Sequence, residues 1–492
     1  MRSKPLESRT SLLIVAFLAG ASMMSVELAA SRVMAPAFGS GIYVWGSLIG
    51  MVMVALSCGY FLGGRVADKS KDRRVLFNAL LFAGIAVSFV PFLGLQVVMA
   101  SMLAGLRFGP ILASLVLFTI PMCLLSMVSP MVIRFYARDL STIGSSSGLV
   151  YAVSTAGSIF GTFFTAFVLL PELGTKATLL LNASVLFIAG FSMFLSLDKA
   201  LLVILLIPGF FLNNIQDMGL EKIYGDVIYN GESEYNIIRV YDTPKYRMLK
   251  LDEEGVMQTY LVKNSILTGR YYDVYCVGPL LSRGKSVLFL GMAGGTAVKQ
   301  LLNFYDVSVD AVELDPKVVD VAKEYFDVRE GERLRIHVGD GRQYLRGAGK
   351  YDIIDVDTFT GGANIPFHMA TYEFFQEAKG HMTGDGILMM NIVDQEPKKE
   401  LTMSMAYTLK KVFPSVFVVN MGGNQIVIAC KKKTTQSEFI RHLNTNKEGD
   451  LDEITNLVKS NLNEFNSKGK AVFTDDKSNI EELTFRTRSM NW

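Results

Sequence analysis

The sequence is poor in the residue types that build disulfides and metal centres. Its 492 residues include only four cysteines and four histidines. The cysteines have no spacing typical of a zinc site or of a disulfide framework, and two of the four lie inside apolar runs: Cys58, Cys123, Cys276 and Cys430. We therefore expect neither a metal site nor a permanently bound cofactor.

Charged residues are also scarce, and the scarcity is confined to one half of the chain. They make up 19% of the sequence, against about 25% in an ordinary soluble protein. Residues 1–213 contain 14 Lys/Arg and 7 Asp/Glu, whereas residues 214–492 contain 34 and 39. Together with a mean hydropathy of +0.32, this division predicts a membrane half followed by an acidic, water-soluble half. The acidic charge makes nucleic acid a poor ligand for the second half.

Long apolar runs fill the first half. A membrane-crossing helix needs about 20 mostly apolar residues, and six stretches meet this requirement: 11–31, 42–64, 75–100, 109–133, 147–170 and 177–197. A seventh run, Ala200–Leu212, contains Pro208. As a helix it would reach about 20 Å into a hydrocarbon core of roughly 30 Å, so we expect it to be re-entrant or interfacial. Residues 1–213 are therefore predicted to form a transmembrane helical domain with six full spans.

The distribution of basic residues predicts the orientation of these spans, because Lys and Arg concentrate in cytoplasmic loops. With the N-terminus in the cytoplasm, eleven of them fall on the cytoplasmic side and three on the other. Six spans then place the soluble half in the cytoplasm, at an inner or plasma membrane. Glu27 is an ionisable residue in the first span and hence a functional candidate; the alternative is that it pairs with Arg32.

The second half changes from short strands to an alternation of strands and helices. Residues 214–283 are predicted to form a small antiparallel sheet from the strands Val227–Tyr229, Tyr235–Tyr241, Arg247–Leu251 and Thr259–Val262. Residues 284–430 alternate strands with helices, which predicts a doubly wound, mostly parallel, Rossmann-like sheet. We expect the charged segment 431–492 to be a polar C-terminal tail without chemistry.

Glycines or carboxylates follow the first three strands of the predicted parallel sheet, at the edge where such sheets bind ligands. A Gly-rich turn lets a ligand approach the backbone at a helix N-terminus. A carboxylate about 20 residues later suits two ribose hydroxyls, and a third strand end can accept from an adenine amino group. These residues are Gly291, Gly294 and Gly295, then Glu313, then Asp340 and Gly341. Together they resemble the adenosine-sulfonium site of class I AdoMet-dependent transferases.

The fourth strand, Tyr351–Asp357, carries two carboxylates that face the same side. Asp355 and Asp357 are two residues apart, and side chains alternate along a strand. A carboxylate at such a position carries a desolvation cost, which favours a function such as holding a cationic amine or accepting its proton. The alternative is that Asp355 caps a helix or binds water near the sheet edge.

Residues 222–430 resemble the spermidine synthase (polyamine aminopropyltransferase) family. The resemblance rests on Glu232–Tyr235, Leu251-Asp252 with Gln258, Val287–Gly295, Val312–Pro316, Gly339–Gly341 and Tyr351–Asp357. The membrane half, with Glu27, Arg32 and Gly64–Asp68, is similar to the transmembrane branch of that family. Most of the chain is therefore covered, except the segment after about Lys431.

The resemblance implies a reaction in which an amine attacks the carbon next to the sulfonium of decarboxylated S-adenosylmethionine (AdoMet), and 5′-methylthioadenosine leaves. It implies cosubstrate binding by the Gly-rich turn, Gln258, Glu313 and Asp340, and catalysis by Asp357 with Tyr271. Asp355 joins the catalytic candidates through its position beside Asp357. The expected partners are a small amine, an AdoMet-type cosubstrate and membrane lipid, and a homo-oligomer is left open.

The chain departs from the family pattern at two carboxylates that recognise cations. Ala293 stands where the family has the Asp that holds the aminopropyl ammonium, and Thr360 where it has the Asp for the far end of the diamine. The first loss removes a repulsion against a carboxylate, so intact AdoMet would fit the same position. The second loss weakens recognition of a long diamine, for which Asp355 compensates in part.

Three functions therefore stay open. The first is a membrane-bound aminopropyltransferase that makes a polyamine. The second is a transferase or lyase that uses intact AdoMet, by aminocarboxypropyl transfer or by intramolecular cleavage. The third is a transporter or sensor whose soluble half binds a polyamine or adenosine ligand without turnover.

Overall fold

The structure is a computed structural model that describes most of the chain. The described residues are 9–39, 41–70, 72–137, 139, 142–191, 224–252, 257–360, 364–395, 397–445, 449–466 and 471–489. The chain divides into two compact units, Met1–Leu220 with Glu232–Glu234, and Glu221–Gly231 with Tyr235–Trp492. The first unit is helical and the second has an α/β fold.

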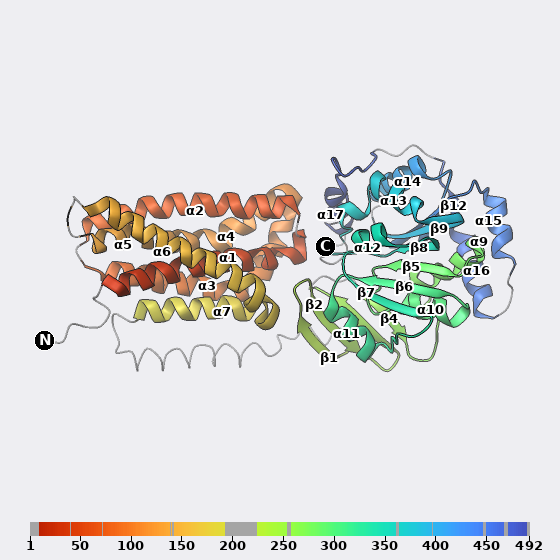
Figure 1. Cartoon of the computed structure of the whole chain (residues 1–492), viewed down its shortest axis with the longest axis horizontal. Helices are drawn as coiled ribbons and strands as arrows, with labels where there is room; N and C mark the ends of the chain where they lie inside the picture. The colour runs from red at the N-terminus through yellow and green to blue at the C-terminus, as the bar shows by residue number, and fades with distance from the viewer. Residues whose placement is uncertain are drawn as a thin grey trace. The chain divides into compact units, whose positions relative to one another are not determined.

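The helical unit consists of long apolar helices that run alongside one another (Figure 1). Their bounds are α1 Arg9–Phe38, α2 Ile42–Lys69, α3 Arg74–Ser101, α4 Gly105–Ser126, α5 Val128–Tyr136, α6 Ile143–Phe164 and α7 Leu170–Phe191. A π-helical turn, Thr165–Leu169, joins α6 to α7. Within the described residues, these helices occupy each of the six stretches predicted as spans. The short run Ala200–Leu212 lies outside the described residues.

Glycines determine where these helices turn and how closely they pack. Gly105 and Gly174 both have φ of +77°, a conformation that an L side chain rarely adopts. Gly105 precedes α4, and Gly174 interrupts the helical backbone within α7. A Cβ on Gly157 would lie 2.1 Å from the carbonyl oxygen of Phe17, so α1 and α6 pack through small residues as membrane helices commonly do.

Four continuous helical segments are long and apolar enough to cross a membrane: Arg9–Phe38, Ile42–Lys69, Arg74–Tyr136 and Ile143–Phe191. The last two contain 63 and 49 residues, which is far more than the roughly 20 that one crossing needs. Each of the two contains a turn, at Gly105 or Gly174. Large apolar side chains are exposed on these segments, among them Leu103 at 93% and Phe167 at 72%. The unit is therefore compatible with a membrane protein.

The α/β unit begins with a four-stranded sheet in the order β1-β2-β3-β4. Its strands are β1 Asp226–Glu232, β2 Ile237–Asp242, β3 Tyr246–Leu251 and β4 Met257–Val262, and β3 pairs antiparallel with both β2 and β4. Ile238, Val240 and Leu249 are fully buried in the same apolar core as one face of the larger sheet. The small sheet therefore packs against the larger one.

The larger sheet has eight strands in the order β12-β10-β11-β9-β8-β5-β6-β7. Their bounds are β5 Ser286–Leu290, β6 Ser308–Glu313, β7 Leu334–Val338, β8 Tyr351–Val356, β9 Met382–Val393, β10 Ser415–Met421, β11 Asn424–Cys430 and β12 Leu462–Glu464. Strands β9, β8, β5, β6 and β7 are parallel neighbours, and the other three pair antiparallel. The prediction of a doubly wound, mostly parallel sheet is confirmed.

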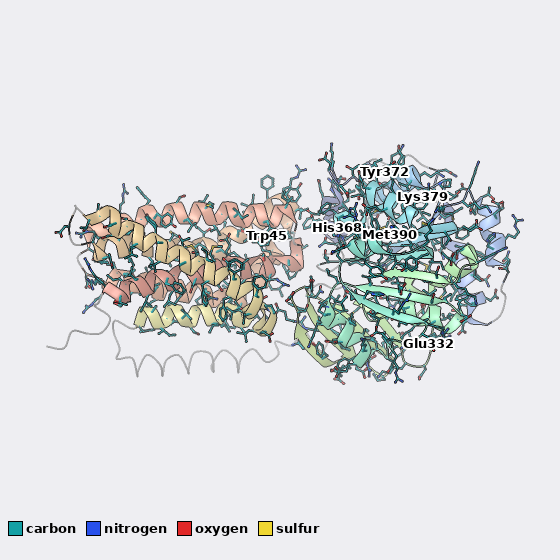
Figure 2. The ribbon with its side chains drawn as sticks, in the orientation of Figure 1. Trp45, Glu332, His368, Tyr372, Lys379 and Met390 are labelled. Atoms are coloured by element: carbon teal, nitrogen blue, oxygen red, sulfur yellow. The ribbon has the colours of Figure 1, made fainter. Side chains whose placement is uncertain are left out.

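Helices cover both faces of this sheet and enclose two apolar cores. One face carries α10 Thr296–Phe304, α11 Pro316–Tyr325, α15 Gln436–Leu443 and α16 Asp450–Asn461; the other carries α12 Gly341–Gly347, α13 Tyr372–Gly380, α14 Glu400–Val412 and α17 Ile480–Ser489. Figure 2 shows Met390 within the unit and Glu332 at its surface. Met390 on β9 is only 1% exposed, because side chains of a parallel sheet are buried on both faces.

The segment after Lys431 packs into this unit, whereas the sequence analysis treated residues 431–492 as a polar tail. Strand β12 extends the sheet by pairing with β10. Phe439 and Phe473 are 0% exposed, and Ile454 is 1% exposed. The composition concealed this packing because a few apolar residues at helical spacing form a buried face among many charged neighbours.

Candidate active site

The Gly-rich turn after β5 requires glycine for two physical reasons. Gly291 has φ of +87°, and a Cβ on it would lie 2.3 Å from the carbonyl oxygen of Asp357. Gly295 has φ of +75° and precedes α10. The N–H of Gly294 donates to Thr259 Oγ1 at 2.9 Å. Strand β4 of the small sheet thus holds the turn that opens α10.

Glu313 lies at the end of β6 and contacts the same turn. Its Oε2 accepts from the Ala293 N–H at 2.9 Å, and its Oε1 accepts from the Asp315 N–H at 3.3 Å. Burial raises the pKa of Glu313, and these backbone donors offset the effect in part. Ala293 itself has φ of +47°, a strained conformation for a residue with a Cβ. The structure therefore brings Glu313 and the Gly-rich turn together.

Asp340 caps the N-terminus of α12, just after β7. Its Oδ1 accepts from the Gln343 N–H at 2.8 Å, and its Oδ2 lies 3.1 Å from Nε2 of His368. Both side chains are more than one-third exposed. A Cβ on Gly341 would lie 3.2 Å from Met369 Cε, so this position tolerates little bulk. Asp340 keeps an accessible face at the carboxyl edge of the sheet.

Asp357 follows β8 and is the most closely held carboxylate of the site. Its Oδ1 accepts from Asn391 Nδ2 at 2.8 Å. Burial raises the pKa of Asp357 to about 7, against hydrogen bonds from Asn391 and Tyr271 that lower it. The side chain therefore exchanges its proton near neutral pH, as a general base requires.

Asp355 has a different environment from Asp357 although both face the same side of β8. It is 0% exposed, and neither carboxylate oxygen has a hydrogen-bond partner. Burial raises the pKa of Asp355 far above its ordinary value, and the nearby Asp357 raises it further. A carboxyl in this environment is neutral at pH 7, so it attracts no cation by charge.

The structure places Tyr271 beside Asp357 and Gln258 on the small sheet. Tyr271 begins a 3₁₀ segment, Tyr271–Val277, and burial raises its pKa well above the ordinary value, with Asp357 as a second cause. Gln258 lies on β4, where its Oε1 accepts from the Leu251 N–H at 2.8 Å. Its neighbour Thr259 is the residue that contacts the Gly-rich turn.

Sequence reasoning missed three residues that contact the predicted ones: Thr259, His368 and Asn391. Each lies on a different element from its partner, so no local motif announces it. Among the described residues, no group of three or more His, Cys, Asp or Glu side chains is arranged to hold a metal ion. The polar groups of this edge are carboxylates, amides, hydroxyls and one imidazole.

Comparison with known proteins identifies the family. Residues 275–438 match the family described as "Spermine/spermidine synthase domain". A "Polyamine aminopropyltransferase" from Prochlorococcus marinus (strain MIT 9301) is 30% identical over 203 residues, which cover 38% of this chain and 68% of the relative. The chain belongs to the spermine/spermidine synthase family.

Two further relatives differ in how much of the chain they cover. A "Probable polyamine aminopropyl transferase" from Bifidobacterium longum is 28% identical over 287 residues, 52% of this chain but only 62% of the relative. "Polyamine aminopropyltransferase 2" from Aquifex aeolicus is 24% identical over 462 residues, 87% of this chain and 90% of the relative. The second alignment is long enough to include much of the helical half.

Proposed function

We propose that the protein is a membrane-bound polyamine aminopropyltransferase that uses decarboxylated AdoMet and an amine. The observation that carries the proposal is Asp357, a buried carboxylate with a pKa of about 7 at the carboxyl edge of the sheet. Its family membership and the names of its relatives support the reaction class. No permanently bound cofactor takes part in the proposed reaction.

In the proposed reaction, the amine nitrogen attacks the carbon next to the sulfonium. A C–N bond forms and the C–S bond breaks, so the electron pair stays on sulfur and 5′-methylthioadenosine leaves. Asp357 accepts the proton that the nitrogen loses. A pKa near the working pH suits this role, because a base of that kind is ionised often enough to act and basic enough to take a proton. Asn391 and Tyr271 hold the carboxylate in place.

The remaining candidates bind the cosubstrate in this proposal. Glu313 accepts from the ribose hydroxyls, and Asp340 accepts from the adenine amino group. The turn Gly291–Gly295 passes close to the sulfonium, and Gln258 supports it from β4. Asp355 does not touch the substrate, because it is neutral and fully buried.

A second function is favoured by one observation, the alanine at position 293. No carboxylate stands there to repel the carboxylate of intact AdoMet. In this alternative the same attack transfers an aminocarboxypropyl group, or the carboxylate of AdoMet itself attacks and again releases methylthioadenosine. Both reactions use the adenosine-binding residues in the same way.

We also propose that the helical unit anchors the enzyme with its N-terminus and its α/β unit in the cytoplasm, by six spans of an inner or plasma membrane. The exposed apolar side chains of the helices support contact with lipid. The excess of basic residues on one side of the predicted spans supports the orientation. Labelling of introduced cysteines in the loops of intact cells tests it.

The activity is tested by incubating the purified full chain with decarboxylated or intact AdoMet, with and without putrescine, and measuring nucleosides by mass spectrometry. We expect methylthioadenosine from the decarboxylated donor only when the diamine is present. Methylthioadenosine from intact AdoMet would support the second function. Binding without any nucleoside product would contradict both and favour a sensor or transporter. The Asp357→Asn variant serves as the inactive control.

A further inference from the structure

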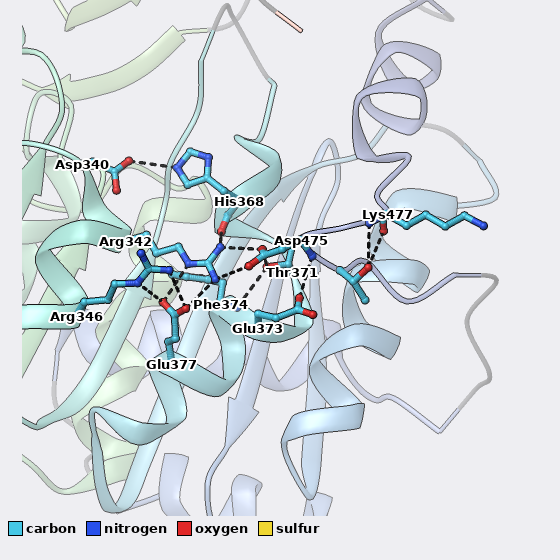
Figure 3. Close-up of polar contacts among 11 residues, drawn as sticks. Asp340, Arg342, Arg346, His368, Thr371, Glu373, Phe374, Glu377, Asp475 and Lys477 are labelled. Atoms are coloured by element: carbon cyan, nitrogen blue, oxygen red, sulfur yellow. Dashed lines mark hydrogen bonds and ion pairs between the residues drawn. The ribbon is translucent and has the colours of Figure 1, made fainter. Parts of the chain in front are cut away.

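One polar cluster beside the proposed adenine position is built from residues that family membership does not explain. Arg342 lies two residues after Asp340, and its side chain is only 7% exposed. It contacts Glu377 on α13 and Asp475 from the C-terminal segment (Figure 3). Asp475 lies outside residues 275–438, the range that matches the family.

All five N–H groups of the Arg342 guanidinium have an acceptor. Nε and Nη2 donate to the two Glu377 oxygens at 3.0 and 2.8 Å. Nη1 and Nη2 donate to the two Asp475 oxygens, both at 2.8 Å. The remaining donor on Nη1 reaches the backbone carbonyl of His368 at 2.9 Å. Two paired carboxylates fix the guanidinium plane, and that plane in turn fixes the backbone of His368.

Asp475 holds the same loop by two further contacts. Its Oδ1 accepts from Thr371 Oγ1 at 2.6 Å, and its backbone N–H donates to Glu373 at 2.9 Å. His368 lies between this cluster and Asp340, with its ring turned toward Asp340 and its carbonyl toward Arg342 (Figure 3). A continuous chain of contacts therefore connects the C-terminal segment to the carboxylate proposed to bind adenine.

We propose that His368 is a nucleoside-binding residue, and that Asp475 is a positioning residue that acts on it through Arg342. The inference rests on the proposed function, since it assumes that Asp340 faces the adenine. His368 and Asp340 are 38% and 36% exposed, so both side chains are accessible to a ligand. The C-terminal segment 471–489 thereby becomes part of the cosubstrate site.

Asp475→Asn tests the positioning role, because the amide loses the charge and turns an N–H group toward a guanidinium N–H. We expect affinity for methylthioadenosine to fall on the order of tenfold, the usual effect of losing a charged hydrogen bond. Asp475→Glu should recover part of that affinity. Asp476→Asn is the matched control, because this exposed neighbour should bind as the wild type does. Calorimetry on the full chain in detergent measures all four.

A double-mutant cycle separates positioning from a general loss of structure. If Asp475 acts through His368, Asp475→Asn should weaken binding in the wild type but add nothing to His368→Ala. The KM for the amine and the rate at saturating cosubstrate should stay unchanged. Additive losses, or equal binding by the Asp475→Asn and Asp476→Asn variants, would overturn the inference alone. Failure of the wild type to bind methylthioadenosine would instead overturn the proposed function, and the inference with it.

Discussion

The two sides of the candidate site treat the same kind of residue in opposite ways. On the reaction side, Asp357 is buried beside neutral donors, and its pKa rises to about 7. On the adenine side, Glu377 and Asp475 face guanidinium groups; hydrogen bonds from Arg342 are the main cause that lowers both pKa values, that of Glu377 to about 2. Carboxylates with neutral partners exchange protons near pH 7, whereas those paired with arginine stay charged. The comparison therefore separates residues for chemistry from residues for architecture.

The largest effect is expected from Asp357→Asn on the reaction side. The amide cannot accept a proton, so turnover should fall about a thousandfold, within the usual range for a lost general base. Affinity for methylthioadenosine should stay within twofold, because the adenine side is untouched. Rates of methylthioadenosine release and calorimetric binding are compared in one preparation. Activity that persists in this variant would remove Asp357 from its proposed role.

Glu313→Gln should produce the next largest effect, this time on binding. The amide keeps the shape but loses the charge that receives the ribose hydroxyls and the Ala293 N–H. We expect methylthioadenosine affinity to fall by roughly ten- to a hundredfold. Glu332→Gln is the control, since Glu332 is exposed at the surface (Figure 2). Equal affinity in the two variants would place the ribose elsewhere.

Asn391→Ala sharpens the comparison through the pH profile. The Asn391 hydrogen bond lowers the pKa of Asp357 against the effect of burial, so its removal should raise that pKa above about 7. Because the base acts in its ionised form, the rise of kcat/KM with pH should move to higher pH. Activity at pH 7 should fall severalfold and recover at pH 9. An unchanged profile would mean that Asp357 does not control the rate.

Asp355→Val should have the smallest effect on activity and a measurable effect on stability. The folded protein must keep this buried carboxyl neutral, and its raised pKa makes that increasingly unfavourable as pH rises above about 4. Valine should therefore stabilise the fold by about 1–3 kcal/mol, more at pH 8 than at pH 5, with turnover within twofold. Thermal unfolding at both pH values measures the gain. A large loss of turnover would return Asp355 to the catalytic set.

Local sequence patterns predict the strands and the residues at their ends. The first helices and strands follow from apolar periodicity, and the turn at Gly291 follows from its glycines. The partners come from pairing between distant segments. Asn391 lies 34 residues after Asp357 and contacts it because the strand containing Asn391 pairs with β8. Asp475 lies 133 residues after Arg342. No local motif predicts such contacts, so the supporting residues had to come from the structure. The roles of the site residues stay predictions.

The choice of donor tests the central claim most directly. Decarboxylated and intact AdoMet are offered together to the full-length protein with putrescine, and the two donors carry different isotope labels in the methylthio group. The account predicts that the released methylthioadenosine carries the label of the decarboxylated donor and appears in equal amount with the aminopropylated amine. Label from intact AdoMet, or nucleoside release without an amine product, would contradict it.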